Sequence, residues 1–105
     1  MSAWDANIVK VEIPGKPDAD EYVRELSGKD LERVLNAFPD GQSTEDQMVA
    51  ACILFSCDKD GVSRFTDEDH EKISNAPIAT IIAVAEKAME INGLNEDDAD
   101  LTPGQ

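Results

Sequence analysis

Positive charge is scarce in this 105-residue sequence. Its 9 lysines and arginines stand against 23 aspartates and glutamates, which gives a formal net charge of −14 at pH 7. Proteins that bind nucleic acid use Lys and Arg to displace condensed counterions, and anionic membrane surfaces attract the same residues. We therefore expect neither nucleic acid nor a membrane as a partner.

Cysteine and histidine are also rare. Two cysteines, Cys52 and Cys57, and one histidine, His70, are too few for a structural zinc site, which takes four such ligands at paired spacings. We expect both thiols to stay reduced and to act as small apolar side chains.

Signatures of catalysis are missing too. No nucleophile is spaced to form a dyad with His70, and the chain has no glycine-rich phosphate loop and no nucleophile elbow. The sequence thus predicts a protein that is not an enzyme and that needs no cofactor or metal.

Long apolar runs are absent. No stretch approaches the 18 or so apolar residues of a membrane span. The first ten residues, MSAWDANIVK, lack the basic and then apolar layout of a signal peptide. We expect a cytosolic protein.

The length fits one domain, because domains typically run on the order of 100 to 150 residues. Hydrophobic residues make up 41% of the chain, which is too many for a disordered protein. We expect a flexible N-terminus at residues 1–6, a folded domain at residues 7–94 and an acidic, disordered tail at residues 95–105.

A β-hairpin is predicted near the N-terminus. Val9, Val11 and Ile13 alternate with polar neighbours, as in a half-buried strand, and Pro14 ends the pattern. After the turn-rich segment PGKPDAD, residues 21–26 can return antiparallel to the first strand.

Two helices are predicted next. Ser27 can cap the first, whose apolar residues share one stripe: Leu31, Val34, Leu35 and Phe38. Thr44 and Gln47 form a capping-box pattern before the apolar run MVAACILF. We expect that run to lie in a central helix over residues 45–57.

Two further helices are predicted after the turn sequence DKDG at 58–61. Thr66 opens a short one, and Asn75 and Pro77 separate it from the last, which spans 78–92 and ends at Asn92-Gly93. The expected fold class is therefore mostly α with a short N-terminal β-hairpin, a small single-domain helical fold of about four helices.

Three segments form an ordered pattern: EYVRELSGKDLERV at 21–34, CDKDGVSRFTDEDHEKI at 57–73 and PIATIIAVAEKAMEINGL at 77–94. Taken in this order, they resemble the tail assembly chaperones of bacteriophages with long non-contractile tails. In that family a short strand leads through a similar string into the first helix, a D-x-D-G turn precedes an FTDED helix start, and the last helix runs into an NGL ending with an acidic tail. His70 and the region of Trp4 depart from the family pattern.

The resemblance implies a non-enzymatic chaperone that coats the tape measure protein, keeps it soluble in the host bacterial cytoplasm and is absent from the finished virion. It also implies that a longer form, made by ribosomal frameshifting, recruits the tail tube protein, with this chain as the short form. We expect apolar contacts with the tape measure protein through one face of the last helix, at Ile81, Ile82, Ala85 and Met89. Broad apolar stripes on the helices over 45–57 and 78–92 also predict self-association.

Two alternatives remain open. An acidic surface can imitate DNA phosphates and inhibit a host nucleic-acid enzyme. The segment starting at Ser56 also matches part of an EF-hand calcium loop, with Asp58, Asp60 and Gly61 in place. However, the loop has Ser at its first position and Asp67 at its last in place of the bidentate Glu, so a tight polar turn is favoured.

Overall fold

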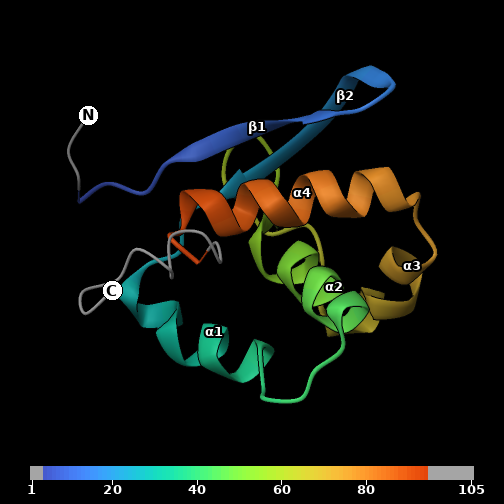
Figure 1. Cartoon of the computed structure of the whole chain (residues 1–105). Helices are drawn as coiled ribbons and strands as arrows, with labels where there is room; N and C mark the ends of the chain where they lie inside the picture. Colours follow the sequence, from blue (N-terminus) through green and yellow to red (C-terminus); the bar gives the residue numbers. More distant parts are fainter. Residues whose placement is uncertain (1–3, 95–105) are drawn as a thin grey trace, which may run out of the picture.

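The computed structural model describes residues 4–94. Strands and α-helices follow one another along this part of the chain (Figure 1). They are β1 (Ile8–Ile13), β2 (Lys16–Arg24), α1 (Leu31–Ala37), α2 (Thr44–Phe55), β3 (Ser56–Cys57), α3 (His70–Ser74) and α4 (Ile78–Ile91). Short 3-10 turns, η1 (Gly28–Asp30) and η2 (Asp67–Asp69), lead into α1 and α3.

The prediction of a mostly α fold is wrong. The hairpin is part of a three-stranded antiparallel sheet in the order β1-β2-β3, so the domain is a small α/β fold. The third strand comes from residues that were predicted to continue the central helix: Ser56 turns to an extended conformation (φ −66°, ψ 137°), and Cys57 pairs with Tyr22. The extra strand gives β2 a hydrogen-bonded neighbour on both sides.

The N-terminal hairpin is confirmed, but it is longer than predicted. Val9 lies opposite Val23, and Val11 lies opposite Glu21. The turn takes only Pro14 and Gly15, and most of the segment expected to be a turn belongs to β2. Gly15 has φ +77°, a conformation that glycine adopts without steric cost.

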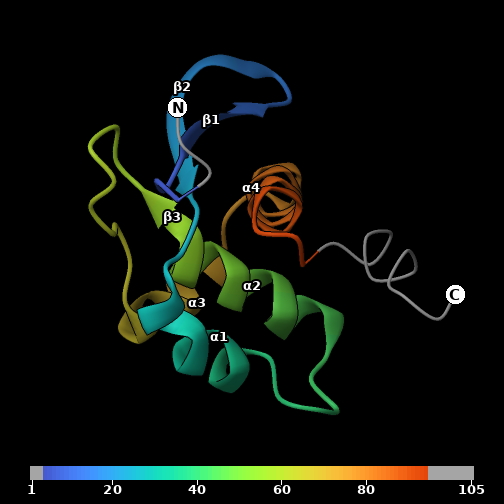
Figure 2. The same ribbon diagram turned by 90° about the vertical axis from the view of Figure 1, so that its left-hand side faces the viewer.

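The core lies between the sheet and the two longest helices. Figure 1 shows α4 beneath the hairpin and α2 on the far side of α4, and Figure 2, which looks along α4, shows the hairpin curving over it. The last five residues of α2, Ala51 to Phe55, are almost or fully enclosed, because α2 is contacted from several sides. The remaining buried apolar residues are Val11, Ile13, Val23, Val49, Cys57, Ile73, Val84, Ala85 and Ala88.

Helix starts agree with the sequence at two of four places, because α4 begins directly after Pro77 as predicted and Thr66 caps the turn before α3. Thr66, the predicted start of the short helix, forms a reciprocal capping box with Asp69 before α3. The cap of α2 is Ser43, one residue before the predicted Thr44, and its hydroxyl oxygen accepts from the Asp46 N–H at 3.1 Å. Ser27 caps no backbone N–H, because its hydroxyl donates to the Asp30 carboxylate.

The predicted end of α4 is confirmed. Gly93 adopts φ +70°, its N–H donates to the Glu90 carbonyl at 3.2 Å, and the Leu94 N–H donates to the Met89 carbonyl at 2.8 Å. These two bonds satisfy carbonyl groups that the last helical turn leaves without partners.

The predicted N-terminal segment and C-terminal tail lie mostly outside the residues that the structure describes. The acidic tail at 95–105 and the first three residues of the N-terminal segment 1–6 are not among the described residues. Within residues 4–94, no helix is both long and apolar enough to cross a membrane.

Candidate protein-binding site

The four residues predicted to contact a partner lie on α4, but three of them are committed to the domain itself. Ala85 is 3% exposed and belongs to the core. Ile81 and Met89 are half-buried and pack against that core. Ile82 is partly exposed and is not among the residues packed on the core, so it alone of the four is free to reach a partner without rearrangement of the helix.

Two strongly exposed leucines lie instead on α1. Leu31 is 59% exposed and Leu35 is 66% exposed, and the two lie one turn apart on the same side of the helix. Val34 and Phe38, from the same predicted stripe, are half-buried and pack against the core. The stripe on α1 is therefore only half covered, and we call Leu31 and Leu35 the α1 leucine pair.

The helical spacing of these residues predicts the stripe, but it does not mark the stripe as a binding surface. Its apolar spacing shows which residues share a side of the helix, yet it does not show how far the neighbouring helix reaches across that side. The structure supplies the missing fact, because α1 contains no fully buried residue.

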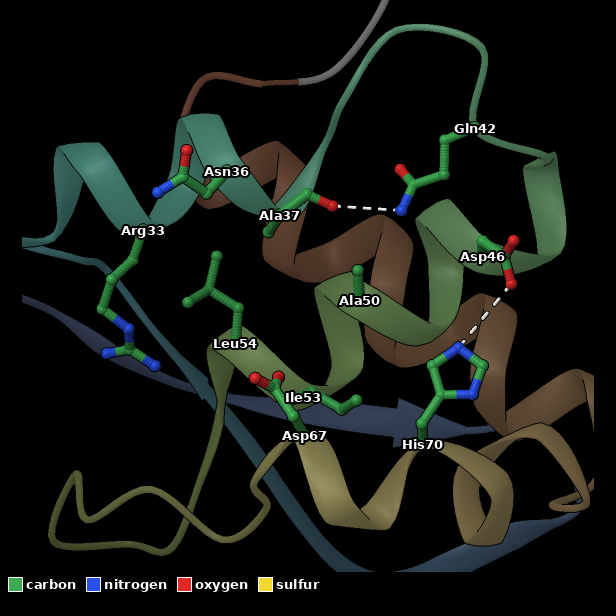
Figure 3. A pocket seen from close by; sticks show the side chains of 10 residues that line it. All are labelled: Arg33, Asn36, Ala37, Gln42, Asp46, Ala50, Ile53, Leu54, Asp67 and His70. Atoms are coloured by element: carbon green, nitrogen blue, oxygen red, sulfur yellow. Dashed lines mark hydrogen bonds and ion pairs between the residues drawn. The ribbon is translucent and has the colours of Figure 1, made fainter.

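A hollow of about 490 Å³ opens between α1, α2 and the start of α3 (Figure 3). Its floor is apolar and its rim is polar. His70 and Asp46 face each other at 3.6 Å between Nε2 and Oδ1, and Gln42 donates from Nε2 to the Ala37 carbonyl at 3.1 Å. The other residues that line it are Arg33, Asn36, Ala50, Ile53, Leu54 and Asp67.

The hollow contains the lone histidine but not the groups that would make it catalytic. Among the described residues that line it, none has a hydroxyl or thiol that His70 could activate as a nucleophile. Asp46 is about half exposed, as is His70. A polar contact this exposed contributes little to stability.

Both cysteines are buried free thiols. Burial, together with the nearby Glu21 carboxylate, raises the pKa of Cys52 to about 12. Burial also raises the pKa of Cys57. Because the thiolate is the reactive form, neither residue is suited to nucleophilic or redox chemistry at neutral pH.

The DKDG segment forms the predicted polar turn. Asp58 Oδ1 accepts from the Asp60 N–H at 2.8 Å and from the Val62 N–H at 3.0 Å. These backbone donors, with that of Val62 the stronger, hold the pKa of the Asp58 carboxyl below its usual value. In the part of the chain that is described, no three Asp, Glu, Cys or His side chains come together in a group that could hold a metal ion.

Comparisons with known proteins provide no relative. No protein-family model matches the chain, no curated protein is significantly similar in sequence, and no solved structure is significantly similar in fold.

Proposed function

We propose that this chain is a non-enzymatic tail assembly chaperone, the short form of its family, that binds the tape measure protein of a long-tailed bacteriophage and keeps it soluble in the host cytoplasm. The longer, frameshifted form would add the contact with the tail tube protein. The proposal rests on the ordered sequence resemblance over residues 21–94. The structural observation that supports it is the exposed α1 leucine pair on a strongly acidic domain.

The α1 leucine pair is suited to an amphipathic helix as partner. Apolar residues one turn apart on a helix match the i, i+3, i+4 spacing by which helices recognise one another. Burial of apolar surface contributes about 25 cal/mol per Å². The net charge of −14 on the whole chain keeps the resulting complex in solution.

Two leucines form a small surface. A stable two-protein interface buries roughly 800 Å² on each partner, and two side chains cannot supply that area. Many copies arrayed along one long partner compensate for weak single contacts, because each neighbouring contact raises the effective concentration of the next. A long tape measure protein offers such a series of sites, and arrayed copies would also account for the predicted self-association.

The test is co-expression with the tape measure protein of the same phage. The wild-type chain should raise the soluble fraction of the tape measure protein severalfold. The double variant Leu31→Glu, Leu35→Glu should abolish this effect while keeping its circular dichroism spectrum, because both positions are exposed and Glu is a good helix former.

The matched control is the double variant Val62→Glu, Ile78→Glu. It adds the same charge at two apolar positions that are also exposed, 61% and 74%, but that lie away from α1. It should solubilise as well as the wild type. A tape measure protein that is equally insoluble with and without the wild-type chain would refute the proposed function, and equal loss in both double variants would refute the role of α1.

The inhibitor that imitates DNA is the second candidate. The net charge supports it, but the exposed leucines do not, because a protein that imitates phosphates needs an acidic contact surface. Ile82→Glu separately tests the predicted contact on α4, since this partly exposed residue is not packed on the core.

A further inference from the structure

One edge of the sheet is open. In the described part of the chain, β1 pairs only with β2, and no strand lies on its other side. The Glu25 N–H donates to the Asn7 carbonyl at 2.9 Å, so the backbone groups of Asn7 point toward β2. Backbone groups of alternate residues in an antiparallel strand point to the same side, so those of Val9 and Val11 also point toward β2. The backbone N–H and C=O groups of Ile8, Lys10 and Glu12 therefore point away from the sheet.

A groove runs beside this open edge. Two hollows of about 400 and 440 Å³ meet at Lys10, Val11 and Glu12. The hollow of about 440 Å³ continues past the hairpin turn at Pro14, and the hollow of about 400 Å³ continues along α4. Figure 1 shows β1 above this helix. The α4 residues that line it are Ala83, Glu86, Lys87 and Glu90, which form one stripe along the helix.

The groove is acidic. Lys87 lies 3.4 Å from Glu90, and Lys10 lies 3.9 Å from Asp20, so each lysine has a carboxylate beside it. Among the described residues, Glu12 and Glu86 have no ion-pair partner. The two glutamates leave an excess of negative charge beside the free backbone groups.

We propose that β1 and α4 form a docking groove for an extended, basic segment of another protein, which adds a fourth strand to the sheet at β1. The backbone of that segment pairs with Ile8, Lys10 and Glu12, which is β-strand addition. Lysine or arginine at the positions of that segment whose side chains face α4 meets Glu86. This surface is separate from the α1 leucine pair and does not depend on the proposed function.

A second copy of this chain is the less suitable occupant. Strand-to-strand pairing of two copies would bring two chains, each of net charge −14, together, and like charges at close range oppose association. A cationic segment gains from the same field, because a surface of one sign attracts oppositely charged partners.

The probe is a synthetic peptide of alternating lysine and valine, eight residues long, with blocked termini. Hydrogen exchange followed by NMR should show that the outward amides of Ile8, Lys10 and Glu12 exchange fast in the free protein, whereas Val9 and Val11 are already protected. Saturating peptide should slow the outward amides at least tenfold. No saturable binding at millimolar peptide, or binding without this protection, would overturn the proposal.

Two matched pairs of variants separate strand pairing from simple charge attraction. Lys10→Pro removes the outward N–H, and Lys10→Ala removes the same charge but keeps that donor. Binding should be lost in the first and retained in the second. Glu86→Lys should weaken binding at least tenfold, whereas Glu68→Lys, an equal charge change at an exposed site on η2, should not.

Equal weakening by Glu86→Lys and Glu68→Lys would mean that the peptide recognises only net charge, and the proposal would then fail. If Lys10→Pro does not fold, the amide protection and the glutamate pair decide. Light scattering of the free protein provides the last check. A dimer whose outward β1 amides are already protected without peptide would mean that a second copy occupies the edge, and this result would overturn the proposal.

Discussion

Asn92 and Leu26 lie 66 positions apart in the chain and are joined by a hydrogen bond, from the Leu26 N–H to Asn92 Oδ1 at 2.9 Å. The same amide donates from Nδ2 to the Arg24 carbonyl at 3.1 Å and to the Ala88 carbonyl at 2.9 Å. One side chain thus ties the end of β2 to the end of α4. It satisfies three backbone groups at the ends of these two elements.

Asn92→Ala should lower the free energy of unfolding by about 2 kcal/mol, because it leaves partly buried backbone groups without partners. Asn75→Ala is the control. Asn75 also donates to a carbonyl of its own helix, that of Glu71 at 2.9 Å, but it makes no hydrogen bond to another element. Urea unfolding should show a loss below about 1 kcal/mol for the control. Equal losses would mean that the link between strand and helix adds nothing.

Gly61→Ala should destabilise the fold more than Gly41→Ala. Both glycines have positive φ, +87° and +83°, so both substitutions carry about 1 kcal/mol or more of backbone strain. Only at Gly61 would the added Cβ lie 2.9 Å from Ile8 Cδ1, whereas nothing lies within 4 Å at Gly41. Ile8→Val removes that carbon and should bring the two losses close together in thermal unfolding. If Gly61→Ala still costs more stability than Gly41→Ala in the Ile8→Val background, contact with Ile8 Cδ1 is not the cause.

Stability should fall at high pH through Cys52. Its thiol ionises near 9.0 in the unfolded chain and at about 12 in the folded one, so folding favours the neutral form. The contribution of the neutral Cys52 thiol to the free energy of unfolding is fully present below pH 9 and is lost as the pH rises toward 12. At pH 10 the loss should be about 1.4 kcal/mol. Cys52→Ala should show a smaller fall between pH 8 and 10 than the wild type, and parallel curves would contradict the raised pKa.

Calcium should not bind to the DKDG turn. Asp58 Oδ1 is engaged by two backbone N–H groups, and the loop lacks the terminal bidentate Glu that completes a calcium shell. Isothermal titration at low salt should show no site with micromolar affinity. A one-to-one site would revive the EF-hand interpretation.

Local signals allowed much of the fold to be predicted. Pro14 and Gly15 end β1, Thr66 caps the turn before α3, and Gly93 ends α4, because each acts on backbone groups within a few residues. β3 could not be found in this way. Ser56 and Cys57 follow an apolar run without a polar side, and their strand conformation depends on pairing with β2, far away in the sequence.

The candidate sites were harder to predict than the elements that carry them. The last helix was correctly identified as broadly apolar, but Ala85 is used by the core, since α2 and the sheet both pack on α4. Leu35 belonged to a recognised stripe, and only the position of α1 beside α2 shows that it remains exposed. The open edge at β1 follows from strand order, which spacing along one strand does not specify.

The position of β2 between two strands has a consequence for folding during synthesis. The hairpin can form as soon as Arg24 has left the ribosome, yet an isolated two-stranded hairpin is only marginally stable. Its other neighbour arrives with Cys57, and the Asn92 link arrives with the end of α4. Pairings this distant are slow because the chain loses entropy when it closes long loops. The nascent hairpin therefore exposes the edge of β2 until Cys57 emerges, and it lacks the Asn92 link until the end of α4 follows.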